Sequence, residues 1–249
     1  ISLGRQWFFT MELVDGVDVV RWVRPDGGAG CDLARLRGVL PQLVGALCAL
    51  HRAGKVHRDV KPPNVLVTPA GRAVLLDFGL TTRVAVDDVL TDGSIAGTVD
   101  YMAPEQSLGG AVGPAADWYA LGAVLYEALT GRLPFSGSPV EILDQKRQRE
   151  PPAPATIAPE VPADLDALCR ALLAREPAAR PSGRELSRRF ALETAGADEE
   201  ILPVEPPFVG RAAELAALGR AFDDARTHGP VTVFVQGESG VGKSALVVE

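Results

Sequence analysis

Eight consecutive residues, His57 to Asn64 (His-Arg-Asp-Val-Lys-Pro-Pro-Asn), hold a carboxylate, an ammonium and an amide in one short stretch. Two prolines follow Lys61, so beyond that residue the stretch is a loop and not a helix. Asp59 could accept the proton of an incoming hydroxyl, and Lys61 could neutralise the charge of a phosphoryl group in transit. Asn64, five positions after Asp59 (64 − 59), could hold a magnesium ion. These residue types at this spacing suit the transfer of a phosphoryl group from ATP.

A second metal ligand is expected at Asp77. Two short apolar runs, Val65–Val67 and Ala73–Leu76, are joined by a loop that contains proline and glycine, which predicts a hairpin. This hairpin places Asn64 at the start of one strand and Asp77 at the end of the other. Two oxygen ligands would then converge on a hard cation, with room left for phosphate oxygens.

The loop resembles the catalytic loop of the protein kinases, whose pattern is His-Arg-Asp-x-Lys-x-x-Asn. Two further stretches resemble motifs of that family in the expected order: Asp77-Phe78-Gly79 its metal-binding motif, and Ala103-Pro104-Glu105 the end of its activation segment. The alternative is a plain polar turn between a helix and a strand, where histidine, aspartate and asparagine are common. Three motifs in order favour the kinase interpretation, which covers residues 1 to about 192.

The resemblance implies roles for further residues by family position. Thr98 would hydrogen-bond to the catalytic aspartate, and with Lys61 it indicates a Ser/Thr kinase. The strand predicted from Gln6 to Leu13 and the turn after it resemble the hinge that binds adenine through its backbone. A buried strand followed by a glycine turn would explain the same residues. The implied catalytic residues are Asp59, Lys61, Asn64, Asp77 and Thr98. The implied nucleotide-binding residues are Met11 (gatekeeper), Glu12, Val14 (adenine), Asp18 (ribose) and Leu66 (floor of the adenine site).

Two helices are predicted to position these residues. Apolar residues recur every three or four positions from Val39 to Ala53, which indicates an amphipathic helix that leads into the catalytic loop. A second, apolar helix is predicted from Asp117 to Leu129, with Asp117 as its cap. By resemblance Asp117 should also brace the backbone of the catalytic loop, and Arg180 should form a buried pair with Glu105.

Other polar residues receive structural or regulatory assignments. His51 and His57 are predicted to be structural, and Glu150 to Pro162 reads as a loop. The polar segment from Asp77 to Glu105 is the activation-loop candidate, in which a phosphate on Thr91, the first candidate, or on Ser94, the second, would pair with Arg58. Alternatively, Arg58 pairs with an acidic side chain and no phosphate is needed.

A second pattern follows a predicted linker at residues 193–206. The apolar run Val231–Gln236 predicts a buried strand, and the next eight residues match Gly-x-x-x-x-Gly-Lys-Ser, a P-loop. Its phosphate- and magnesium-binding residues would be Gly237, Gly242, Lys243 and Ser244, with magnesium on Ser244. Residues 207–249 therefore resemble the start of an AAA-type or signal-transduction ATPase domain.

Composition limits the class of protein. With 249 residues, 47% hydrophobic and 23% charged, the chain is typical of a soluble globular protein, and its net charge of −7 argues against non-specific nucleic-acid binding. The three cysteines form no Cys-x-x-Cys pair, which predicts reduced thiols and a cytoplasmic location. No apolar run approaching the ~20 residues of a membrane span and no signal peptide are recognised.

Together these patterns predict an α+β protein-kinase-like fold with a mainly α-helical large lobe, followed by the truncated start of an α/β P-loop NTPase domain. Too few residues precede the hinge for the family's Gly-rich loop and strand lysine, so we expect an internal fragment of a bacterial kinase–ATPase fusion. The expected reaction transfers the γ-phosphate of ATP to Ser or Thr of a protein substrate, with Mg²⁺. Neither nucleic-acid nor membrane binding is evident. The alternative is a pseudokinase scaffold in an ATP-gated signalling or transcriptional switch.

Overall fold

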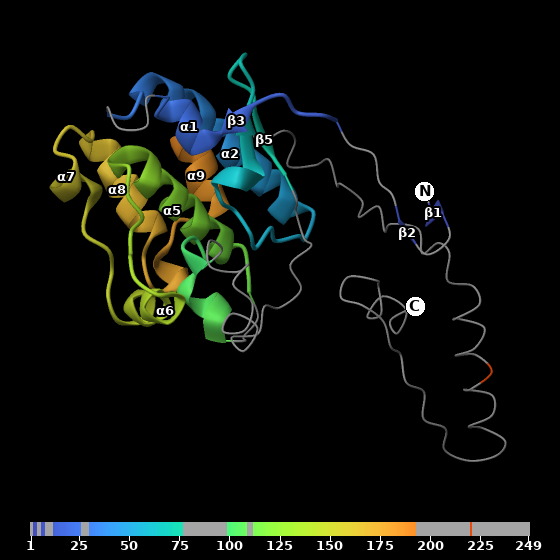
Figure 1. The fold of residues 1–249 in the computed structure, drawn as a ribbon. Coiled ribbons are helices and arrows are strands. Elements are labelled where there is room, and N and C mark those ends of the chain that lie inside the picture. The colour runs from blue at the N-terminus through green and yellow to red at the C-terminus, as the bar shows by residue number, and fades with distance from the viewer. Residues whose placement is uncertain are drawn as a thin grey trace. The chain divides into compact units, whose positions relative to one another are not determined.

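The structure is a computed structural model that describes residues 2–3, 6–7, 12–25, 30–76, 99–108, 112–192 and 220. The chain divides into two compact units, residues 1–199 and 200–249. Within the first unit the described residues form a helical body with two small sheets (Figure 1). This confirms the fold class predicted for the kinase part.

Helix α5 (Ala115–Thr130) is the central element of this body (Figure 1). Nearly all of its side chains are buried, as expected of a helix that is apolar all round. It packs against α8 (Ala163–Leu172), α1 (Val19–Val23) and α7 (Pro154–Ile157). A Cβ at Gly122 would lie 2.8 Å from the Cβ of Leu172, so a glycine is needed where α5 and α8 meet. The predicted helix is confirmed, but Asp117 is not its cap, because Pro114 occupies that position.

Helix α2 (Leu33–Arg52) begins six residues before the predicted start. Asp32 caps it, and its Oδ1 accepts the N–H of Arg35 at 3.0 Å. By length and composition α2 could cross a membrane, so the sequence-based view that no such segment exists was too strict. One face of α2 is buried in the core, against α9 (Gly183–Arg189) and the β-sheet. A core helix accounts for the same apolar pattern.

Strands β3 (Val17–Asp18), β4 (Val65–Val67) and β5 (Ala73–Leu75) form an antiparallel sheet in that order. The β4–β5 pairing confirms the predicted hairpin. Strands β1 (Ser2–Leu3) and β2 (Gln6–Trp7) form a separate pair. The strand predicted to run from Gln6 to Leu13 is wrong at its end, since residues 12–16 have no regular structure; residues 8–11 lie outside the described part.

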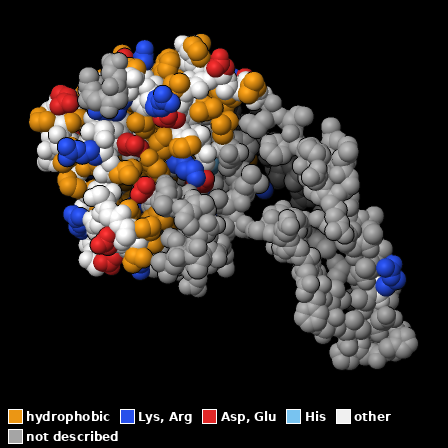
Figure 2. Space-filling view, in the orientation of Figure 1, with side chains coloured by type: hydrophobic (Ala, Val, Ile, Leu, Met, Phe, Trp, Pro, Cys, Tyr) orange, Lys and Arg blue, Asp and Glu red, His pale blue; other side chains and the backbone are white. Residues whose placement is uncertain are grey.

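Four further elements lie within the described residues. They are η1 (Pro62–Asn64), η3 (Pro104–Leu108), α6 (Pro139–Gln148) and η4 (Pro177–Ala179). The loop predicted over 150–162 is interrupted by the short helix α7, which starts at a proline, a residue that suits the first helical turn. Figure 2 shows acidic and basic side chains interspersed over the visible face of the described residues.

Candidate active site

The catalytic loop lies between α2 and β4, and Asp59 is at its centre. Its Oδ2 lies 2.9 Å from Nζ of Lys61 and accepts a hydrogen bond of 2.9 Å from Nδ2 of Asn64. The side chains of Asp59 and Lys61 keep 13% and 22% of their surface exposed. The structure thus brings the three predicted residues together, and the side chains of Asp59 and Lys61 remain partly exposed.

The amide of Asn64 is oriented for a cation. Its nitrogen donates to the backbone carbonyl of Asp59 at 2.8 Å and to the carboxylate of the same residue, so its oxygen is left as the atom that can bind a metal. An amide oxygen is a hard ligand of the kind Mg²⁺ takes. Asp77 lies outside the described residues, yet the N–H of Leu76 donates to the carbonyl of Asn64 at 2.8 Å. The last described residue before position 77, Leu76, is therefore held beside Asn64.

Asp117 braces the catalytic loop, as predicted by resemblance. The carboxylate is fully buried; Oδ1 accepts the N–H of Arg58 at 2.7 Å, and Oδ2 accepts that of His57 at 2.8 Å. Nε2 of His51 lies 2.7 Å from the same Oδ2, which confirms a structural role for that histidine. Arg58 has a φ of 68°, in the left-handed region that costs a non-glycine residue about 1–2 kcal/mol. The two hydrogen bonds to Asp117 hold this strained backbone in place.

His57 ties the catalytic loop to the end of β5. Its ring is buried, and Nδ1 accepts the N–H of Asp59 at 3.3 Å. Because Nδ1 is an acceptor, the proton of the neutral ring is on Nε2, which donates to the carbonyl of Leu76 at 2.8 Å. These two contacts use both ring nitrogens for positioning, so the structural assignment of His57 is confirmed.

The predicted nucleotide residues meet at the β3–β4 pairing. Asp18 is the register partner of Leu66, so the predicted ribose and adenine contacts lie side by side. One oxygen of Asp18 also caps α1 by accepting the N–H of Arg21 at 2.9 Å. A Cβ at Gly16 would lie 2.7 Å from the carbonyl oxygen of Val67, which explains the glycine in the hinge turn.

The hinge itself is only partly described. The side chain of Val14 is half-buried, and that of Glu12 is exposed and paired with Arg72. A nucleotide contact from Glu12 would thus come from its backbone. Met11, Asp77 and Thr98 lie outside the described residues, as do the predicted P-loop residues Gly237, Gly242, Lys243 and Ser244. Their assignments stay predictions.

A third part of the site is the stretch 99–107, which follows the activation-loop candidate. Nε2 of Gln106 donates to the carbonyl of Arg58 at 3.0 Å, next to Asp59. The carboxylate of Glu105 accepts hydrogen bonds from both terminal nitrogens of Arg180, at 2.6 and 2.9 Å. The arginine side chain has no exposed surface. The predicted buried pair is confirmed, and it anchors this stretch to the core.

Sequence reasoning missed two polar contacts of the same stretch. The hydroxyl of Tyr101 donates to Glu127 at 2.6 Å, and burial raises the pKa of both groups. Glu127 is the second of two acids in α5, which is otherwise apolar, and this was a usable signal. Lys146 is buried and contacts the backbone of the stretch. Nothing in the sequence around Lys146 marks it as different from a surface lysine.

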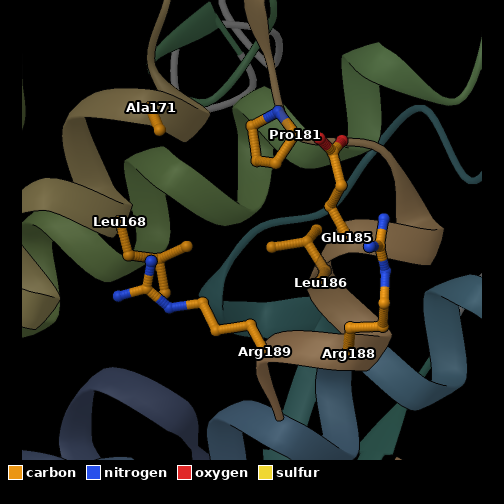
Figure 3. Close-up of a pocket in the computed structure, with 7 residues that line it drawn as sticks. All are labelled: Leu168, Ala171, Pro181, Glu185, Leu186, Arg188 and Arg189. Atoms are coloured by element: carbon orange, nitrogen blue, oxygen red, sulfur yellow. The ribbon is translucent and has the colours of Figure 1, made fainter.

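A separate hollow of about 540 Å³ lies between α8 and α9 (Figure 3). Leu168 and Ala171 form one side, while Leu186, Arg188 and Arg189 form the other. No residue of the catalytic loop lines it. We therefore assign it no part in the chemistry.

A helical lobe that presents aspartate, lysine and asparagine on one braced loop defines the class: a protein kinase large lobe. The model of the protein kinase domain matches residues 3–190, and that of the AAA ATPase domain matches residues 207–249. The chain belongs to the protein kinase family. The two matches imply the use of ATP. The predicted domain boundaries themselves stay predictions.

Named relatives lie in the same family. The chain is 38% identical over 214 residues to the serine/threonine-protein kinase PknA of Mycobacterium tuberculosis, covering 86% of this chain and 48% of the relative. It is 39% identical over 178 residues to PknL of the same species, covering 71% and 44%. The chain therefore spans about half the length of these relatives. A crystal structure of Rad53 1–466 in complex with AMP-PNP matches with a TM-score of 0.56 and 28% identity, covering 72% of this chain and 45% of that one.

Proposed function

We propose that the protein containing this chain is a serine/threonine kinase that transfers the γ-phosphate of ATP to protein hydroxyls in a Mg²⁺-dependent reaction. It would be a signalling regulator that also carries an AAA-type ATPase domain. One observation carries the proposal: on a single braced loop, the carboxylate of Asp59 lies 2.9 Å from the ammonium of Lys61 and 2.9 Å from the amide nitrogen of Asn64. The names of the relatives, which are serine/threonine kinases, support it.

The described residues divide the work of phosphoryl transfer, which depends mainly on positioning and charge stabilisation. Asp59 orients the acceptor hydroxyl and takes its proton as the bond to phosphorus forms. Lys61 lies beside that carboxylate, so its ammonium can neutralise the oxygens of the phosphoryl group in transit. The amide oxygen of Asn64, with Asp77, would hold Mg²⁺, which when bound neutralises charge on the phosphates.

The chain spans about half the length of its named relatives. We therefore assign the activity to the full-length parent that contains this chain, and we propose that the parent also holds a Gly-rich loop and a strand lysine. We also propose a cytoplasmic location, supported by the three free thiols. Burial raises the pKa of the Cys31 thiol to about 11, which suits an unreactive structural cysteine.

The test is to incubate the full-length parent with γ-labelled ATP, with and without Mg²⁺, and to identify the phosphorylated residues by mass spectrometry. We expect phosphoserine or phosphothreonine only when Mg²⁺ is present. Asp59→Asn should remove the product, whereas Asp164→Asn, at an exposed surface pair, should retain it. A parent that binds ATP but phosphorylates nothing would instead support the pseudokinase alternative.

A further inference from the structure

Lys146 is a buried lysine at an unexpected place. It lies on α6 with 1% of its surface exposed, and it forms no ion pair with the carboxylates that the structure describes. Removing an ammonium from water costs several kcal/mol unless protein groups replace the water. Here three backbone carbonyls do so: Nζ donates to the oxygens of Val99, Asp100 and Met102 at 2.7, 2.7 and 2.8 Å.

The three carbonyl acceptors match the charged form of the Lys146 side chain. An ammonium has three N–H donors and a neutral amine has two, so three acceptors select the ammonium. Burial lowers the pKa of Lys146 to about 7, and the carboxyl of Asp100 acts in the opposite direction. The ring of Tyr119 lies 5.4 Å from Nζ, and its phenol stays neutral because burial raises its pKa. Arg180 also contacts that ring.

The three carbonyls belong to a stretch that adjoins the active site. It directly follows Thr98 and precedes the 103–105 motif. Gln106 joins it to the carbonyl of Arg58, on one flank of Asp59. The metal and nucleotide residues lie on the other flank, toward Asn64 and β4. Ala103, which follows residues 99–102, donates its N–H to the same Gln106 at 2.8 Å, so this stretch is tied to the flank of Asp59 away from the metal and nucleotide residues, where we expect the acceptor protein to approach.

Apolar packing alone would not fix this backbone. Val99 and Met102 pack in a small cluster with Phe135, Ile142 and Leu143, separate from the main core. Such packing is non-directional, whereas three hydrogen bonds from one ammonium define the positions of three carbonyls. Lys146 therefore provides a directional link between α6 and this part of the site.

We propose that Lys146 is a positioning residue for phosphoryl transfer: its ammonium fixes the backbone of residues 99–102 and so aligns the acceptor protein with Asp59. This inference rests on the proposed kinase activity. It assigns Lys146 a role in placing the acceptor protein. Lys146 itself touches neither nucleotide nor acceptor. Its loss should therefore act on the protein substrate more than on ATP.

The test uses the full-length parent with ATP and Mg²⁺, and dephosphorylated casein as the acceptor. Lys146→Met keeps the length of the side chain and removes every donor. Lys146→Arg keeps the charge and several donors, and Lys146→Gln keeps two donors without charge. The matched control is Arg147→Met, since Arg147 is the neighbouring cation on α6, is exposed, and its side chain donates to the carbonyl of Leu143 within its own helix.

We expect Lys146→Met to lower kcat/KM for casein on the order of 10- to 100-fold, because a small displacement of a bound substrate slows its reaction by up to about 100-fold. KM for ATP should stay within about twofold of the wild-type value, and Lys146→Arg should restore part of the loss. Hydrogen exchange at the amides of residues 99–103 should accelerate about tenfold or more, while α5 stays protected. Arg147→Met should match the wild type in each measurement.

Unchanged kcat/KM for casein in Lys146→Met, or a fall in kcat/KM with no change in exchange at residues 99–103, would overturn the positioning role. If the methionine variant does not fold, Lys146→Gln decides, and wild-type rates and protection in that variant would equally overturn it. A wild-type parent that phosphorylates no protein would refute the kinase activity instead. The exchange measurement would still report whether Lys146 holds the stretch.

Discussion

Replacing Asp117 with asparagine should both destabilise the fold and inactivate the site. The substitution preserves shape, so it creates no cavity and changes only charge and hydrogen bonding. In the wild type the buried carboxylate accepts the N–H groups of His57 and Arg58 at 2.8 and 2.7 Å. Asparagine has one acceptor oxygen, so its NH₂ group must face one of these two donors.

The magnitude follows from these contacts. A hydrogen bond to a charged group contributes about 1.5–3 kcal/mol, and a buried donor without a partner costs about 1–3 kcal/mol. The variant loses the charge assistance of both bonds and leaves one N–H of the loop without an acceptor. We therefore expect a loss of about 3–5 kcal/mol in the free energy of unfolding. Arg58 would also be free to leave its left-handed conformation, which would displace Asp59.

The assay is urea unfolding of the 249-residue chain, followed by tryptophan fluorescence, since Trp118 is buried next to the substituted position. Asp164→Asn is the matched control, because the pair of Asp164 with Arg37 is half exposed and should contribute only about 0–1 kcal/mol. An Asp117→Asn variant within about 1 kcal/mol of the wild type would refute the bracing role.

Arg180→Met should lower the free energy of unfolding by about 3–5 kcal/mol in urea, because the carboxylate of Glu105 loses its bidentate partner; a loss below about 1 kcal/mol would contradict this. Since the pKa of Lys146 is about 7 in the fold against 10.5 normally, the unfolded chain binds more protons between these values, so stability should rise with pH there. Relative to Lys146→Met, the wild type should gain up to about 2 kcal/mol from pH 7 to 9 in thermal unfolding, and a flat difference would be inconsistent with the lowered pKa. Finally, we expect Thr91→Ala in the parent to lower activity by removing a phosphate that pairs with Arg58, whereas an unchanged rate with a fully dephosphorylated loop would favour constitutive activity.

Much of the catalytic loop could be predicted from the sequence because its chemistry is local. Asp59, Lys61 and Asn64 lie within six residues, and the hairpin after them follows from two apolar runs around a turn. The start of α2 was missed because its capping Asp32 lies upstream of the clearest part of the apolar periodicity. Local patterns thus gave the identity of the site and the type of the elements, but not every boundary.

The contacts that hold the site together were less predictable because they are distant in sequence. Asp117 reads as a helix cap, since an aspartate before an apolar run usually is one, yet its partners lie 59 and 60 residues earlier. Lys146 bonds to carbonyls 44 to 47 residues away, and backbone acceptors have no sequence signature. The resemblance to a family supplied the role of Asp117. Only the fold brings Lys146 to its three carbonyls.

The most direct test of the central claim is the single-turnover rate of γ-phosphate transfer by the full-length parent and its Asp59→Asn variant. The asparagine is isosteric but cannot accept the proton of the hydroxyl, and general-base catalysis typically contributes 10²–10⁴-fold. We predict a loss of at least about 100-fold in the transfer rate, with the affinity for ATP unchanged within about threefold. Transfer at the wild-type rate in Asp59→Asn would contradict the account.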